Sequence, residues 1–507
     1  MVAKIHSMGT YGMEAFPVQV ETDLSAGLPA FEVVGLPDAA VKESRDRVRA
    51  AMKNCGFDFP VSRITINLAP AGKRKEGPIY DLPLFLSLLM ASGQLSCELS
   101  GSVFLGELSL SGEVRGVRGV LPMAARAKAA GFRQLFVPAV NALEGAAIEG
   151  LAVYPVENIP QLVAHLRGLE AIASAKPRVH RFAPDPLMDF ADVKGQPEVK
   201  RALEVAASGS HSVLLLGSPG AGKSMLARRL PSILPEMTFQ EALEASMIHS
   251  VAGQLPEGGS LLASRPFRAP HHTVSAAGLS GGGTSPKPGE ISLAHNGVLF
   301  LDELPEFSRQ VMEVLRQPME DGSVTISRVG GNATFPCKFM LVAAMNPCPC
   351  GYFGHPTVPC TCPARGVERY LSRVSGPLLD RMDIHIEVPP VEFDELASSA
   401  RGESSEAVRR RVNAARRLQV ERFQGLGYAC NADIPAAQLR EMCNPTGQAD
   451  QLLKRAFERF GLSARSYGRV LKVARTIADL DGVERVDASH AGEAVQYRTL
   501  DRKYWAR

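Results

Sequence analysis

The chain has 507 residues, of which 45% are apolar and 21% charged, a length that corresponds to about three domains with a core each. Its 46 glycines and 36 prolines follow no period, and its longest apolar run, residues 82–91, is about half of what a bilayer span needs, so collagen-like, low-complexity and membrane-spanning classes are excluded. The net charge is only +3 and the N-terminal residues lack the apolar stretch of a secretory signal, so we expect a cytoplasmic protein.

The first 170 residues alternate short β-like runs with helical segments, which is typical of an α/β or α+β domain. Residues 171–188 are rich in alanine, proline and basic residues, and their prolines interrupt any helix, so we place a linker there. The strands expected in this first domain are 18–21, 31–34, 64–68, 103–105 and 134–137, and its helices are 38–54 and 121–130.

A second domain is expected at residues 189–395, where a helix at 199–207 precedes apolar strands at 213–216, 298–301 and 339–344. Buried strands separated by helices indicate a parallel sheet with crossover connections. After about residue 393 the strands stop, and amphipathic helices predict a small all-α domain at 396–507. Residues 401–507 carry 20 Lys and Arg against 13 Asp and Glu, which fits either nucleic-acid contact or a solvated helical surface.

The strongest motif is a glycine-rich loop that follows the strand 213–216 and opens a helix, which is the context that a phosphate-binding loop requires. Its backbone amides can surround phosphates, its lysine can reach the outer phosphates, and its serine hydroxyl can bind Mg²⁺. We expect ATP to bind at Gly217, Ser218, Pro219, Gly220, Ala221, Gly222, Lys223 and Ser224.

Two acidic residues follow the strand 298–301, and one polar residue follows the next strand. Asp302 can hold the metal ion and Glu303 can polarise water, the division of work that ATP hydrolysis requires. Asn346 comes at the end of the strand 339–344 and can orient the attacking water if the strands are neighbours. Arg381 follows an apolar helical turn and suggests a site completed by a neighbouring subunit, although such a turn is also found as an ordinary helix end with an exposed charge pair.

Together with residues 189–196, 378–383 and 462–467, these motifs resemble an AAA+ ATPase, and more narrowly the magnesium-chelatase-like ATPases of the bacterial YifB/ComM type. The resemblance runs essentially end to end. It implies an AAA+ parallel-sheet core with an insert in its second helix, a helical lid, ATP and Mg²⁺ as cofactors, and a ring of about six subunits. It also implies Arg381 as arginine finger, with Arg373 in reserve, and Arg465 as a second sensor of the outer phosphate.

The same resemblance marks two candidate DNA-contacting elements. Residues 250–290, which include His271 and His272, lie where such ATPases carry an insert, and residues 324–335, with Arg328 at their middle, correspond to a hairpin that faces the ring pore. A solvated loop is the alternative for each.

The N-terminal region resembles the proteolytic domain of Lon-type proteases, but it departs from the protease pattern. Ile79 stands near the position of the nucleophilic serine, and Leu121 stands where the partner lysine is expected. Without a hydroxyl and an amine there is no activated nucleophile, so we expect a non-proteolytic module.

Four of the nine cysteines, an odd total that does not favour a disulfide framework, lie within fifteen residues. Cys348, Cys350, Cys360 and Cys362 can complete a tetrahedral Zn²⁺ shell, and His355 can replace one of them. The spacing within each pair is tighter than usual for zinc, so reduced thiols without metal are the alternative.

Our leading hypothesis is an ATP-driven ring motor on DNA, a helicase that promotes branch migration in recombination or natural transformation. A chelatase-type ATPase that drives Mg²⁺ insertion or remodels another protein partner is the alternative, because it would share every nucleotide residue. The extra N-terminal domain and the cysteine loop favour the DNA motor over the chelatase-type ATPase, since a dedicated chelatase subunit needs neither. A Lon-type protease is disfavoured by Ile79 and Leu121.

Overall fold

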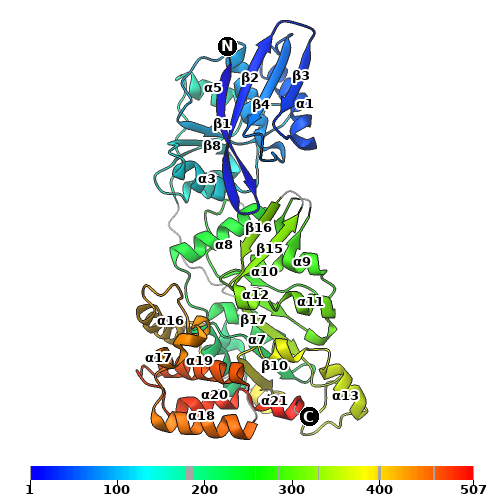
Figure 1. The fold of residues 1–507 in the computed structure, drawn as a ribbon, viewed down its shortest axis with the longest axis vertical. Helices are drawn as coiled ribbons and strands as arrows, with labels where there is room; N and C mark the ends of the chain where they lie inside the picture. The colour runs from blue at the N-terminus through cyan, green and yellow to red at the C-terminus, as the bar shows by residue number, and fades with distance from the viewer. Residues whose placement is uncertain are drawn as a thin grey trace.

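The computed structural model describes residues 2–177, 188–256, 258–283, 285–328, 331–397, 401–460 and 463–505. An N-terminal unit (3–177) stands at one end of an elongated molecule, and a central unit (188–397) and a helical C-terminal unit (401–505) form the other end (Figure 1). This mixed α/β architecture with a parallel-sheet core confirms the predicted fold class. Most of the predicted linker, residues 178–187, lies outside the described residues.

The N-terminal unit is built on a seven-stranded mixed sheet of order β3-β4-β2-β1-β5-β8-β9. β2 pairs antiparallel with both β1 and β4, and the other neighbours are parallel. The strands are β1 (Ala3–Tyr11), β2 (Glu14–Ser25), β3 (Ala30–Val34), β4 (Arg63–Ala69), β5 (Ser102–Phe104), β8 (Gln134–Pro138) and β9 (Ala152–Val156), with a short pair β6 (Glu107–Leu108) and β7 (Val114–Arg115).

Five helices complete this unit. The apolar run that the sequence places at 82–91 folds as a helix whose residues are almost all buried in the N-terminal core. Within the described parts of the chain, no helix has the length and apolar character needed to span a membrane. The helices are α1 (Ala39–Asn54), α2 (Asp81–Ala91), α3 (Val120–Ala129), α4 (Ala142–Ala146) and α5 (Ile159–Leu166).

The central unit contains a five-stranded parallel sheet of order β11-β14-β17-β10-β18. Because side chains alternate along a strand, Val213 and Leu215 of β10 enter one apolar core while Leu214 and Leu216 enter another on the opposite face. Strands buried on both faces explain the continuous apolar runs in the sequence. The strands are β10 (Val213–Gly217), β11 (Phe267–Arg268), β14 (Val298–Leu301), β17 (Met340–Met345) and β18 (Ile384–Val388).

Two hairpins project from this unit beside each other. Hairpin β12 (Gly281–Gly282) to β13 (Lys287–Pro288) interrupts a helical segment, and hairpin β15 (Ser323–Arg328) to β16 (Gly331–Pro336) precedes β17. The helices of the unit are α6 (Pro197–Gly209), α7 (Lys223–Arg229), α8 (Phe239–Ala252), α9 (Ala276–Ser280), α10 (Glu290–Leu293), α11 (Arg309–Val314), α12 (Pro318–Asp321), α13 (Ala364–Leu371), α14 (Gly376–Leu379) and α15 (Phe393–Ala397).

The C-terminal unit is helical, and its helix α19 packs against α6 of the central unit. Much of its positive charge is paired with carboxylates inside the chain, which was not visible in the sequence. The helices are α16 (Ser405–Arg422), α17 (Leu439–Cys443), α18 (Gly447–Phe460), α19 (Ala464–Leu480), α20 (Ala488–Gln496) and α21 (Thr499–Tyr504). The cations that pair are Arg411, Arg422, Arg440, Arg469, Arg475, Arg498 and Lys503.

The N-terminal unit contacts the central unit at two places. Helix α8 packs against α3, and its Leu243 and Met247 lie against the N-terminal core. The buried carboxylate of Glu144 accepts hydrogen bonds from the backbone N–H of Leu121 and from the Ser250 hydroxyl on α8. The turn between β1 and β2 meets hairpin β15–β16, where a Cβ on Gly12 would lie 2.8 Å from that of Ala333.

Candidate functional site

Three neighbouring strands of the central sheet end at one edge and bring the predicted phosphate-loop residues together with the predicted polar residues. β14, β17 and β10 are parallel and adjacent, so their carboxyl ends meet. Asp302 follows β14, Asn346 follows β17, and the phosphate loop begins at the last residue of β10. This edge is where open parallel sheets bind ligands.

Lys223 lies inside the phosphate loop. Its Nζ donates to the carbonyl oxygens of Gly217 and Ser218, both at 2.8 Å, and to Oδ1 of Asn346 at 3.0 Å. Burial lowers the pKa of the Lys223 ammonium, and the nearby carboxylates of Asp302 and Glu303 oppose that shift. The three acceptors hold the cation at the position from which it can reach a phosphate group.

Ser224 and Asp302 lie face to face. The Ser224 hydroxyl donates to Oδ2 of Asp302 at 2.5 Å, although the two residues are 78 positions apart in the sequence. A hydroxyl and a carboxylate that converge in this way are the oxygen ligands that Mg²⁺ takes beside a nucleotide. The donor set therefore fits a magnesium ion held jointly by α7 and the end of β14.

Glu303 occupies the left-handed region with φ of 54°, a conformation that is costly for a residue with a side chain and is often found at functional sites. Its side chain is 61% exposed, and its Oε2 lies 3.6 Å from Nδ1 of His272. The His272 ring also contacts Phe307 edge-on. The structure thus places His272, predicted as a DNA contact, beside the predicted catalytic base.

Gln196, just before α6, has a structural role that sequence reasoning did not assign. Its Nε2 donates to the carbonyl oxygens of Ala221 in the phosphate loop and Pro389 after β18, both at 2.8 Å. The left-handed backbone of Gln196, φ 57°, aims the side chain at the loop. The only sequence signal for this contact is the Gly195-Gln196 pair before a helix-starting proline.

The three predicted phosphate-sensing arginines have different surroundings. Arg381 is 8% exposed, and its guanidinium donates to Glu320 and to the carbonyl oxygen of Pro377. Arg373 is half-exposed and contacts Glu306, three residues after Glu303. Arg465 is exposed on the first turn of α19. Within a single chain, then, Arg381 points inward and Arg465 is open to solvent.

The two predicted DNA elements lie against each other. The exposed Arg328 of β15 donates to the carbonyl oxygen of Gly283, which belongs to the turn after β12. A Cβ on Gly281 would lie 2.9 Å from Cδ1 of Ile326, so the hairpins pack closely. Residues 284, 329 and 330 lie outside the described residues.

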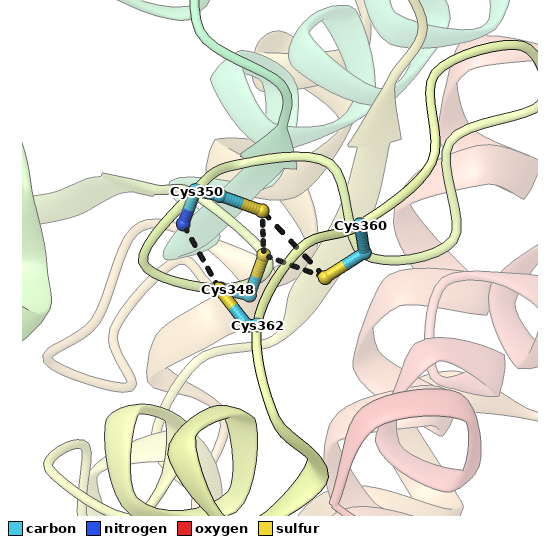
Figure 2. Close-up of side chains that lie close together, drawn as sticks. All are labelled: Cys348, Cys350, Cys360 and Cys362. Atoms are coloured by element: carbon cyan, nitrogen blue, oxygen red, sulfur yellow. Dashed lines mark hydrogen bonds between the residues drawn. The ribbon is translucent and has the colours of Figure 1, made fainter.

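The four predicted zinc ligands meet in the loop between β17 and α13, with all four sulfurs within 4.8 Å of one another. Figure 2 shows the sulfurs of Cys348, Cys350 and Cys360 pointing toward one another, at separations of 3.3 to 3.7 Å. Sulfurs around a tetrahedral zinc, each about 2.3 Å from the metal, are about 3.8 Å apart. His355 is outside this group, and its Nδ1 accepts the backbone N–H of Val358.

The two positions that depart from the protease pattern are apolar and buried. Ile79 is 8% exposed and Leu121 is fully buried in the N-terminal core. The structure therefore places no nucleophile or amine at these two positions.

Comparisons with known proteins agree along the whole chain. Residues 189–396 match the family model described as magnesium chelatase, subunit ChlI, residues 402–498 match its C-terminal model, and residues 20–141 match a further ChlI model. The chain is 43% identical to competence protein ComM of Haemophilus influenzae over 507 residues, 99% of this chain and 98% of that protein. It is also 43% identical to YifB of Escherichia coli, over 98% of this chain and 97% of that protein. The magnesium-chelatase 38 kDa subunit of Rhodobacter capsulatus is 26% identical over 35% of this chain and 55% of that protein.

Proposed function

We propose that this chain, which belongs to the magnesium-chelatase-like AAA+ family of ComM and YifB proteins, is an ATP-hydrolysing ring motor that acts on DNA. Its activity would be that of a helicase that promotes branch migration during recombination or natural transformation. The observation that carries the proposal is the convergence of Lys223, Ser224, Asp302 and Asn346 at one sheet edge. The DNA substrate is supported by full-length similarity to a protein named for competence.

The ATP-site residues have separate roles in this proposal. The loop amides and Lys223 bind the phosphates, Ser224 and Asp302 hold Mg²⁺, and Asn346 orients the attacking water. Glu303 accepts a proton from that water, and its exposed carboxylate is free to approach it. A magnesium ion held there would supply positive charge near the transferring phosphate.

The proposal includes a homo-oligomer, by analogy a hexameric ring, because three arginines would act on phosphate across or beside a subunit boundary. Arg381 is the finger candidate and must leave Glu320 to reach a neighbouring site, whereas the half-exposed Arg373 is the reserve. Arg465 on α19 would contact the outer phosphate from the lid.

DNA contact is proposed at the paired hairpins, where the exposed Arg328 offers a phosphate-binding cation. His271 and His272 remain candidates, and the position of His272 beside Glu303 would connect any such contact to hydrolysis. Seven of the basic side chains described in 401–507 pair with carboxylates, so we rest the DNA proposal on the hairpins and not on that surface.

We assign Zn²⁺ to the four thiols, because all four sulfurs lie within 4.8 Å of one another and three of them are 3.3 to 3.7 Å apart, close to or shorter than the edge of about 3.8 Å in a zinc tetrahedron. We place the protein in the cytoplasm, because none of its nine cysteines, all of which are among the described residues, forms a disulfide, which is typical of proteins in a reducing compartment. The domain boundaries that go with the proposal are 1–170, 189–395 and 396–507, joined by the linker 171–188.

The alternative, a chelatase-type ATPase that drives Mg²⁺ insertion or remodels another protein, is supported by the family models and by relatives named as magnesium-chelatase subunits, which match about a third of the chain. It would use the same nucleotide residues.

The test is steady-state ATP hydrolysis without DNA and with single strands, duplex or a four-way junction, at two salt concentrations. Lys223→Ala is the blank. We expect salt-sensitive stimulation that is strongest with branched DNA, because phosphate contacts weaken as salt rises. Hydrolysis indifferent to every DNA would contradict the DNA proposal and favour the remodelling alternative.

A further inference from the structure

The loop that carries the four cysteines begins at the ATP site itself. Asn346, which binds Lys223, is its first residue after β17, and Cys348 follows two positions later. The side chain of Cys348 is fully buried in the core beneath the sheet. An interaction that holds Cys348 in place therefore also holds the end of β17, which Asn346 follows.

The same loop touches the phosphate loop directly. Gly351 packs on Pro219 so closely that a Cβ on Gly351 would lie 2.3 Å from Cδ of Pro219. The positive φ of Gly351, 85°, also favours glycine at this position, because residues with a side chain rarely adopt it. The turn formed by Cys348 and Cys350 is thus pressed against one wall of the nucleotide site.

A third contact joins the loop to the end of the chain. The ring of Phe353 meets that of Tyr504 of α21 edge-on at 6.1 Å, and the Tyr504 hydroxyl donates to Glu387 of β18 at 3.0 Å. Because β18 is the other neighbour of β10, this contact connects the loop, through α21, to the strand on the far side of β10.

The sulfurs also have the surroundings of metal-bound thiolates. The backbone N–H of Cys350 donates to Sγ of Cys362, and that of Phe353 donates to Sγ of Cys348, both at 3.3 Å. Amide donors of this kind stabilise charge on ligating sulfur and orient the ligands.

We propose that the metal bound by Cys348, Cys350, Cys360 and Cys362 sets the geometry of the ATP site, by clamping the turn that positions Asn346 and Pro219. The metal takes no part in the reaction. Loss of the metal would loosen both the end of β17, which Asn346 follows, and the phosphate loop. This inference rests on the proposed zinc assignment and nucleotide site.

The experiment compares zinc content, measured by elemental analysis, with affinity for a fluorescent ATP analogue in the full-length chain. Cys360→Ser removes one ligand, and Cys97→Ser, a free thiol in the N-terminal unit, is the matched control. We expect about one zinc per chain in the parent and the control, and zinc loss with affinity weakened about tenfold or more in Cys360→Ser.

A second variant separates the clamp from folding. Gly351→Ala leaves every ligand in place but presses on Pro219, so we expect full zinc content with weakened nucleotide affinity. A parent without zinc, or parent-like affinity in both Cys360→Ser and Gly351→Ala, would overturn this inference alone. A zinc-loaded parent that binds no nucleotide would overturn the ATPase proposal as well.

Discussion

Asp383 joins the central unit to the C-terminal helices, and its removal should destabilise both. The side chain is 5% exposed. Its Oδ1 accepts from the Arg469 guanidinium of α19 at 2.6 Å, and its Oδ2 accepts from the backbone N–H of Ser212 at 3.2 Å and faces His211. Burial alone raises the pKa of Asp383, but Arg469 and His211 outweigh it and hold that pKa below its ordinary value.

The perturbation is Asp383→Ala, which leaves the Arg469 guanidinium, 25% exposed, without its carboxylate and, among the described residues, with only the carbonyl oxygen of Arg381 as an acceptor. Removing one partner of a fully buried ion pair costs about 3–5 kcal/mol, and we expect the lower end of that range here because Arg469 is partly exposed and keeps an acceptor. For folding units of this size, that cost corresponds to a fall of about 10 °C in the thermal midpoint. Because the folded pKa is depressed, this stabilisation is complete above the unfolded pKa and is lost only as pH falls through the folded value, so neutral buffer shows the full effect.

Thermal unfolding followed by circular dichroism measures the change. Asp450→Ala, whose pair with Arg440 is largely solvent-exposed, is the matched control and should cost less than about 1 kcal/mol. We also expect slower ATP hydrolysis in Asp383→Ala, because α19 carries Arg465 one turn before Arg469. A midpoint no lower than that of the control would refute the claim that this carboxylate ties the units together.

Two further predictions concern single carboxylates. Glu303→Gln should bind the ATP analogue as the parent does but hydrolyse ATP about 10²–10⁴-fold more slowly, because Asp302 remains while the base is lost; turnover at the parent rate would contradict the assignment. Burial raises the pKa of Glu144, so its contribution to stability is present below the unfolded pKa and is lost as pH rises through the folded pKa. Between mildly acidic and neutral pH, the thermal midpoint of Glu144→Gln should therefore fall less than that of the parent. If the midpoint of the variant changed with pH as that of the parent does, this explanation would be excluded.

The central strands that were predicted correctly from the sequence are those that appear in it as continuous apolar runs. β10, β14 and β17 lie within a residue of the expected ranges because both of their faces are covered. β18 was missed because His385 and Glu387 interrupt its apolar pattern, and the partners of these side chains, Asp501 and Tyr504, come from the last helix. β11, with only two residues, leaves no periodic signal.

The residues of the candidate site also fall into those that the sequence could place and those that it could not. Lys223, Ser224, Asp302 and Asn346 could be placed together from sequence because parallel strands end at one edge. The approach of His272 to Glu303 could not, since it depends on the path of a loop between β11 and α9. One partner of Arg381, Glu320, lies 61 residues away along the chain, and one partner of Gln196, Pro389, lies 193 residues away, so a local sequence pattern cannot predict these contacts.

The packing of α8 against the N-terminal unit affects how the molecule can be dissected. Leu243 and Met247 are partly buried against the N-terminal core, and the Ser250 hydroxyl donates to the buried carboxylate of Glu144. A fragment that begins at residue 188 would expose this apolar face and leave the hydroxyl without its acceptor. Such a fragment should be prone to self-association. A loss of activity in this fragment would therefore reflect its aggregation and would not show a catalytic role for the N-terminal unit.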